Sequence, residues 1–155
     1  MDPVSGTLGL VAGIASIVTI IGKSVCTLNT IRAKYKDAAF NVNLLTAHLH
    51  TVKVALLQVE TLVIETRENE PQHQQLMVEL EQSLDHCGSL IQHIHDHISK
   101  FEWNDELLRV GNKALFLLED QNTKDMMTHL DRHINALNLF LNAFRWYAGR
   151  IWSLF

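Results

Sequence analysis

Apolar side chains recur at alternating intervals of three and four residues in three stretches of the chain, residues 42–63, 76–101 and 127–151. Residues at this spacing lie on one face of an α-helix. The pattern therefore predicts three long helices, each with a row of apolar side chains that we call its seam. The predicted seams are Val42, Leu45, Leu49, Val52, Leu56, Val59 and Val63, then Leu76, Leu80, Leu84, Cys87, Ile91, Ile94, Ile98 and Phe101, and finally Met127, Leu130, Ile134, Leu137, Leu141, Phe144, Ala148 and Ile151.

Short polar segments separate the seams and predict how the helices are connected. The segment ENEPQHQQ, which contains Pro71, lies between the first two seams. A connection of this length favours antiparallel helices. A break near Trp103 precedes a shorter apolar segment at residues 107–118, which predicts shorter helical elements before the third seam.

The N-terminal segment has a different pattern, because residues 3–22 contain no charged side chain. Its length is close to the ~20 residues that cross a bilayer as a helix. Asp2 followed by Pro3 favours a helix that begins here. We expect Gly22 to end or bend this helix and a second short helix to occupy residues 23–36. A cleaved signal peptide fits poorly, since no basic residue precedes the apolar core.

Two interpretations of residues 3–22 remain open: a membrane-inserting helix, and a buried core helix of a bundle. Both hold if the helix is buried in a resting state and released in an active one. The side chains expected to enter a membrane are Val4, Leu8, Leu10, Val11, Ile14, Ile17, Val18, Ile20 and Ile21. Small residues spaced four apart, which let two helix backbones approach closely and predict self-association, are Ser5, Gly9 and Gly13, with Ala12 and Ser16 in a parallel row.

Basic side chains follow the apolar segment and have two interpretations. They are Lys23, Arg32, Lys34 and Lys36. Positive charge near a helix C-terminus complements the helix dipole, and the same charge also attracts anionic lipid headgroups. The chain as a whole has a net charge of −4, which argues against a nucleic-acid partner.

Composition narrows the fold to one helical domain. The chain has 155 residues, 47% of them hydrophobic, which suffices for a single buried core. Seven Gly and two Pro are too few for many turn-linked strands. Two Cys cannot supply a disulfide framework, which favours the cytosol. The fold class is therefore predicted as all-α: a bundle of three long seamed helices, the apolar N-terminal helix and shorter helices, forming one domain over residues 1–155 of a longer protein.

Candidate chemistry is limited to the histidines. The chain has nine His, and two pairs spaced four apart, His93 with His97 and His129 with His133, each lie on one helix face. Three interpretations stay open: a metal site built on facing helices, a pH sensor, and partly exposed helix histidines without a special role. No HExxH, GxSxG, Walker A or dinucleotide-binding motif occurs. The absence of these motifs predicts that the chain is not an enzyme and has no cofactor. Of the three interpretations of the histidines, we favour helix histidines without a special role over a metal site.

Three segments together resemble a known family. They are the opening MDPVSGTLGLVAGIASIVTIIGKSV, the middle FNVNLLTAHLHTVKVALLQVE, and the closing NKALFLLED with HLDRHINALNLFLNAF. In this order they resemble the HeLo-like N-terminal domains of fungal cell-death and receptor proteins, across nearly the whole chain. The family is similar to the four-helix executioner domain of the necroptosis pseudokinase.

The resemblance implies a function in regulated cell death, heterokaryon incompatibility and innate immunity. A resting cytoplasmic monomer would be clustered by an upstream receptor or an amyloid-type motif outside this chain. Residues 3–22 would then insert into plasma-membrane phospholipids and permeabilise them as a homo-oligomer. Some family members place an acid inside the first segment, whereas here only Asp2 precedes it. The alternative is a soluble adaptor domain of a nucleotide-binding receptor, in which the apolar helix stays buried.

Overall fold

The structure is a computed structural model that describes residues 3–36, 39–65, 71–103 and 121–153. Within these ranges it is an all-α bundle of four long helices without a strand. The helices are α1 (Pro3–Lys34), α2 (Ala39–Glu65), α3 (Pro71–Trp103) and α6 (Gln121–Ser153). The predicted fold class is confirmed. The apolar segment at residues 107–118 lies outside the described residues.

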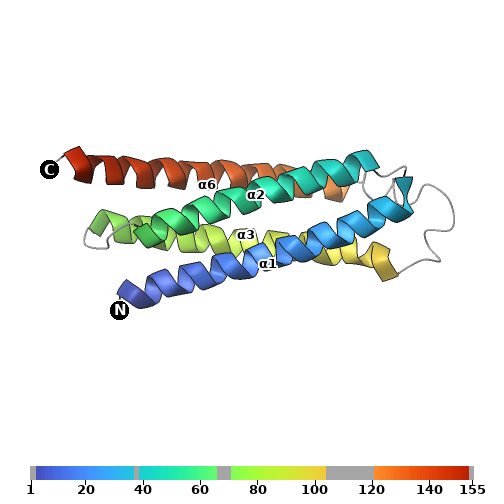
Figure 1. The fold of residues 1–155 in the computed structure, drawn as a ribbon, viewed down its shortest axis with the longest axis horizontal. Helices are drawn as coiled ribbons and strands as arrows, with labels where there is room; N and C mark the ends of the chain where they lie inside the picture. Colours follow the sequence, from blue (N-terminus) through green and yellow to red (C-terminus); the bar gives the residue numbers. More distant parts are fainter. Residues whose placement is uncertain (1–2, 37–38, 66–70, 104–120, 154–155) are drawn as a thin grey trace.

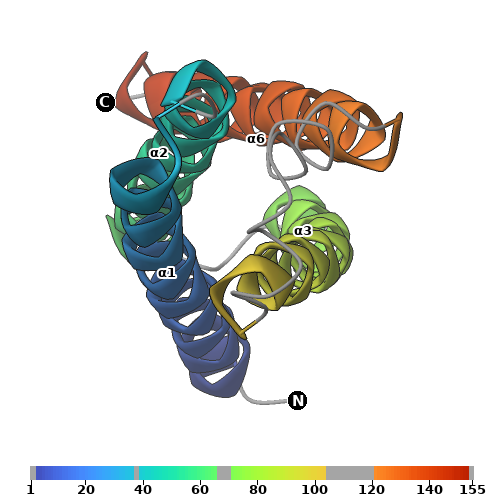
Figure 2. The same ribbon diagram turned by 90° about the vertical axis from the view of Figure 1, so that its right-hand side faces the viewer.

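The helices run in alternating directions, α1 and α3 one way and α2 and α6 the other (Figure 1). The antiparallel orientation predicted for the two helices around Pro71 is thus confirmed for α2 and α3. These two helices are nevertheless not the main packing partners of each other. Viewed along the bundle, α2 packs on α1 and α6, and α3 packs on the same two helices from the opposite side (Figure 2). The contact between α3 and α6 is the least extensive of the four.

The core is built from the predicted seams. Every seam residue of α2 from Val42 to Val63 is buried, and Ala55 joins them. In α3 the buried row runs from Leu80 to Ile98, while Leu76 is half-buried. In α6 the predicted seam residues Leu130, Leu137, Leu141 and Phe144 are buried, whereas Met127 and Ile134 are half-buried. Thr123 and Met126, which were not predicted, are buried at the start of this helix. Side chains of Phe101, Ala148 and Ile151 lie outside the described set.

One prediction about the N-terminal region is wrong, since α1 is a single helix that continues through Gly22 to Lys34. A glycine inside a helix costs only about 1 kcal/mol relative to alanine. On either side of Gly22, α1 buries Ile21 and Leu28 completely. This burial outweighs the glycine, because each large aliphatic side chain contributes roughly 1.5–3 kcal/mol when buried. The predicted second short helix over residues 23–36 is therefore the last part of α1.

Candidate membrane-inserting helix and its packing in the bundle

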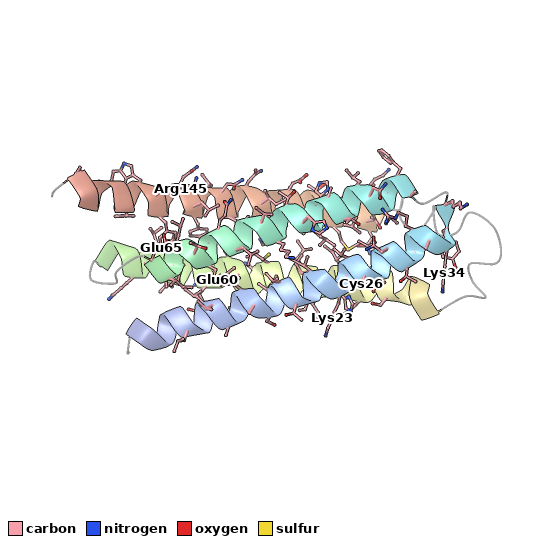
Figure 3. The ribbon with its side chains drawn as sticks, in the orientation of Figure 1. Lys23, Cys26, Lys34, Glu60, Glu65 and Arg145 are labelled. Atoms are coloured by element: carbon pink, nitrogen blue, oxygen red, sulfur yellow. The ribbon has the colours of Figure 1, made fainter. Side chains whose placement is uncertain are left out.

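The two faces of α1 differ in side-chain size rather than in charge. The inward face carries large aliphatic residues: Leu10, Ile14, Ile17, Ile21, Leu28 and Ile31 are all buried. The outward face carries small uncharged ones: Gly9, Ala12, Ala15, Ser16, Thr19 and Gly22 are exposed. Figure 3 shows α1 in the bundle with its side chains. No charged residue occurs before Lys23, so neither face of this half of α1 resembles the polar surface of an ordinary amphipathic helix.

The residues expected to enter a membrane are partly buried in the core. Leu10, Ile14, Ile17 and Ile21 are buried, and Val11, Val18 and Ile20 are half-buried. Leu8 is 64% exposed. The side chain of Val4 lies outside the described set. In this structure most of the large side chains of the segment are therefore covered by α2 and α3.

The predicted row of small residues makes no close helix contact inside the bundle. Gly9, Ala12 and Ser16 are exposed and Gly13 is half-buried, while the side chain of Ser5 lies outside the described set. A Cβ atom added to Gly9 or Gly13 would meet nothing within 4 Å. Close packing therefore does not explain these glycines in the bundle.

The close approach between helices occurs instead at Gly88 of α3. A Cβ atom placed there would lie 3.4 Å from Cγ1 and 3.6 Å from Cδ1 of Ile17. Sequence reasoning did not identify this position. Its signal was present, because Gly88 follows the seam residue Cys87 and is the only glycine between residues 71 and 103.

Two polar side chains of α1, Ser24 and Thr27, also face inward, with exposed fractions of 0% and 6%. The Ser24 hydroxyl donates to the carbonyl oxygen of Ile20 at 2.9 Å and lies 3.2 Å from Nδ1 of His95 on α3. A serine hydroxyl has one proton, so with this proton on the Ile20 carbonyl, Nδ1 of His95 is the donor to Ser24. Thr27 donates to the carbonyl oxygen of Lys23 at 3.1 Å. The buried polar atoms of α1 are thus satisfied, and Ser24 adds a polar contact between α1 and α3.

The four basic residues considered for lipid contact are all exposed. Arg32, Lys34 and Lys36 lie at the C-terminal end of α1, where Arg32 Nη1 donates to Oδ1 of Asn43 on α2 at 3.1 Å. Lys23 lies eleven residues before Lys34 (Figure 3), about 17 Å along the helix. Arg32, Lys34 and Lys36 therefore lie close together at one end of the bundle, and Lys23 lies apart from them.

The two histidine pairs do not form one site. His93 is exposed, while Nε2 of His97 lies 3.4 Å from Oγ1 of Thr123. No group of three or more His, Cys, Asp or Glu side chains able to hold a metal ion is found among the described residues. His133 of α6 instead lies near His86 of α3 and His129 of its own helix. Burial, followed by the charges of His86 and His129, lowers the pKa of His133 below its usual value.

By length and composition, Leu8–Lys34 of α1 is able to cross a membrane, and 28% of its most apolar window is buried in the bundle. Core helices of soluble proteins pass the same test, so this is a property of the helix and not an assignment. No protein-family model, curated protein or solved structure matches this chain. Its function must therefore be argued from its own residues.

Proposed function

We propose that this chain permeabilises membranes, and that the bundle is its resting state. One observation carries the proposal: α1 is an unbroken helix with no charge before Lys23, and it packs its large side chains inward while exposing a small, uncharged face. An ordinary soluble bundle gives its outward faces charged or polar side chains. The exposed half of α1 has the composition of a helix that tolerates lipid. The resemblance to HeLo-like executioner domains supports the same function.

The energetics favour release only when copies assemble. The inward face of α1 exchanges one apolar surrounding for another when it moves from the protein core into lipid, so this face contributes little to the balance. The outward face leaves water on insertion, which is favourable. Release also has a cost, because the apolar seams of α2 and α3 that α1 covers in the bundle become exposed to water when it leaves. Contacts between copies would offset that cost, and this is the reason why an oligomeriser outside the chain belongs to the proposal.

A disulfide between α1 and α3 tests whether α1 must leave the bundle. The Cβ position of residue 88 lies 3.4 Å from Cγ1 of Ile17. The two Cβ atoms are thus within about 5 Å, one C–C bond being ~1.5 Å. Native disulfides join Cβ atoms about 3.5–4.5 Å apart, so Ile17→Cys with Gly88→Cys needs only a small adjustment. Cys26→Ser and Cys87→Ala remove the two native thiols.

The assay is dye release from liposomes that contain anionic lipid, with the protein clustered through a fused oligomeriser. We expect the reduced form to release dye, the oxidised form to release little, and a reductant to restore release. The Ile17→Cys single variant in the same background controls for the oxidant. Equal release by the oxidised and reduced forms would show that α1 does not have to separate from α3, and the proposal would fall.

The second candidate is a soluble adaptor domain, which the outward side of α2 favours. Phe40, Val54 and Ile64 are 76%, 55% and 59% exposed. Apolar side chains exposed along one helix would contribute to a protein-binding surface if a partner covered the whole helix. This function predicts no dye release from either redox form, whether the protein is clustered or not, and a partner that protects α2. The crosslink experiment therefore separates the two candidates.

A further inference from the structure

The outward face of α2 carries almost no charge, although no described helix covers it (Figure 2). Among the exposed side chains of α2, Glu65 is the only Asp, Glu, Lys or Arg, while Lys53 and Glu60 are half-buried. The exposed faces of α3 and α6 differ, because each carries charged side chains along its length. An outward helix face without charge is typical of a helix that a partner covers.

Four exposed residues spaced seven apart form the central line of this face: Phe40, Ala47, Val54 and Thr61. Seven residues are almost two complete turns, so these side chains point the same way along the helix. Further exposed apolar side chains flank the line, namely Leu44, Leu57 and Ile64. They extend over most of the 27 residues of α2, so a partner must be long to cover this face.

The two ends of the outward face of α2 differ in charge. At its beginning, Nη1 of Arg32 donates to Oδ1 of Asn43 at 3.1 Å, which holds a guanidinium beside the face. Lys34 and Lys36 are exposed at the same end. The opposite end carries Glu65 (Figure 3), which forms no ion pair with a described residue. The face is therefore basic at one end and acidic at the other.

We propose that the outward face of α2 pairs with the same face of a second copy of this chain, with the two α2 helices antiparallel. A two-fold contact needs a surface that matches itself, so that residue i meets j and j meets i. With Val54 on the two-fold axis, Ala47 lies opposite Thr61 of the other copy, since each is seven residues from Val54. These three side chains are small, so the two helices are able to approach closely.

The charged ends set the antiparallel direction. Asn43, which holds Arg32, and Glu65 are each eleven residues from Val54, about 17 Å along the helix. Antiparallel pairing therefore brings the basic end of one copy to the acidic end of the other, and the two-fold axis does so twice. Parallel pairing would bring like charges together at both ends, which is unfavourable.

A second copy fits this face better than a lipid surface does. Asn43, His50 and Gln58 are among the exposed side chains, and their polar groups would lack hydrogen-bond partners in hydrocarbon. In the antiparallel pair, Gln58 lies beside Thr51 of the other copy, whose hydroxyl both donates and accepts hydrogen bonds. The pair would supply contacts between copies, which the proposed function requires, but the observations that carry it involve no membrane.

Single cysteines test the pairing and its direction on the full chain in solution without lipid, so failure here is distinguishable from failure of the proposed function. Cys26→Ser removes the exposed thiol, whereas the buried Cys87 stays. In this background Val54→Cys should form a disulfide-linked dimer under mild oxidation. Ala47→Cys should not link to itself, because the two copies of residue 47 would lie about 21 Å apart, but it should link to Thr61→Cys in a mixture.

Sedimentation velocity of the full chain measures the dissociation constant of the dimer. Val54→Glu places two carboxylates on the axis and should raise this constant more than about a hundredfold, whereas Leu139→Glu, at an exposed apolar site of α6, should leave it unchanged. Glu65→Arg should raise it about fivefold, the effect of two exposed ion pairs, and the addition of Arg32→Glu should restore it. Circular dichroism checks that each variant is folded.

Three results would overturn the proposal. A chain that stays monomeric would leave the outward face of α2 to a different partner. Self-linking of Ala47→Cys as strong as that of Val54→Cys would show that the helices do not pair antiparallel around Val54. A dimer that tolerates Val54→Glu, or that the charge exchange between Arg32 and Glu65 does not restore, would be built on another surface.

Discussion

Substitutions at Gly9 and Gly13 should affect the stability of the resting bundle and the assembly of copies in a membrane in different ways. In the bundle a Cβ atom at either position meets nothing within 4 Å. Each glycine inside a helix costs about 0.5–1 kcal/mol relative to alanine. Gly9→Ala with Gly13→Ala should therefore stabilise the fold by about 1–2 kcal/mol, which raises Tm by roughly 2–8 °C for a chain of this size. Thermal unfolding followed by circular dichroism measures this change.

Gly9→Leu with Gly13→Leu is the functional half of the comparison. Leucine has a helix propensity close to that of alanine, so the gain in helix stability should be similar. Its bulk prevents the close backbone approach that small residues permit between helices in lipid. We expect clustered protein with two leucines to release dye roughly tenfold more slowly than the alanine variant, the change that about 1.4 kcal/mol of association free energy produces.

Either measurement is able to contradict this reasoning. A loss of stability in the alanine variant would mean that the two glycines pack closely in the resting bundle. Equal dye release by the alanine and leucine variants, with both folded, would remove the row of small residues from the mechanism. The leucine variant tested without an oligomeriser should release no dye and controls for damage to the fold.

Two further predictions concern the bundle itself. Leu49→Ala should lower the free energy of unfolding, measured in urea, by about 2–5 kcal/mol, because Leu49 is fully buried. Leu139→Ala should change it by less than about 0.5 kcal/mol, since Leu139 is 70% exposed. Equal losses in the two variants would contradict the placement of these helix faces. Burial raises the pKa of the Cys87 thiol to about 11. At pH 8, iodoacetamide should therefore modify Cys87 of the folded protein at least roughly a hundredfold more slowly than the exposed Cys26. Mass spectrometry of the two peptides measures both rates.

The helices and their inward faces could be predicted from the sequence because both depend on local periodicity. In α3 and α6 a polar face accompanies the apolar seam, and in α2 the three-and-four spacing marks the seam even though Phe40, Val54 and Ile64 are exposed beside it, so the spacing identified Leu49, Ile91 and Leu141 as buried. The same approach gave no inward direction for α1, because neither face of residues 3–22 is polar. The prediction that the helix ends or bends at Gly22 was wrong for a related reason. The cost of a glycine is visible in the local sequence, whereas the burial that outweighs it depends on contacts with α2 and α3.

Partners across space could not be predicted in this way. Periodicity shows that α2 and α3 each have a seam, but it does not show that both pack on α1 and α6 rather than mainly on each other. The contacts of Ile17 with Gly88, Ser24 with His95, and His48 with Asp131 depend on how four helices fit together. The sequence by itself determined that this chain forms long helices and which faces of three of them avoid water, because helix periodicity and burial are recorded in neighbouring residues. The tertiary structure decided which helices meet, and thereby turned α1 so that its large side chains are buried and its small ones exposed, because side chains select their partners by shape and close packing over long sequence separations.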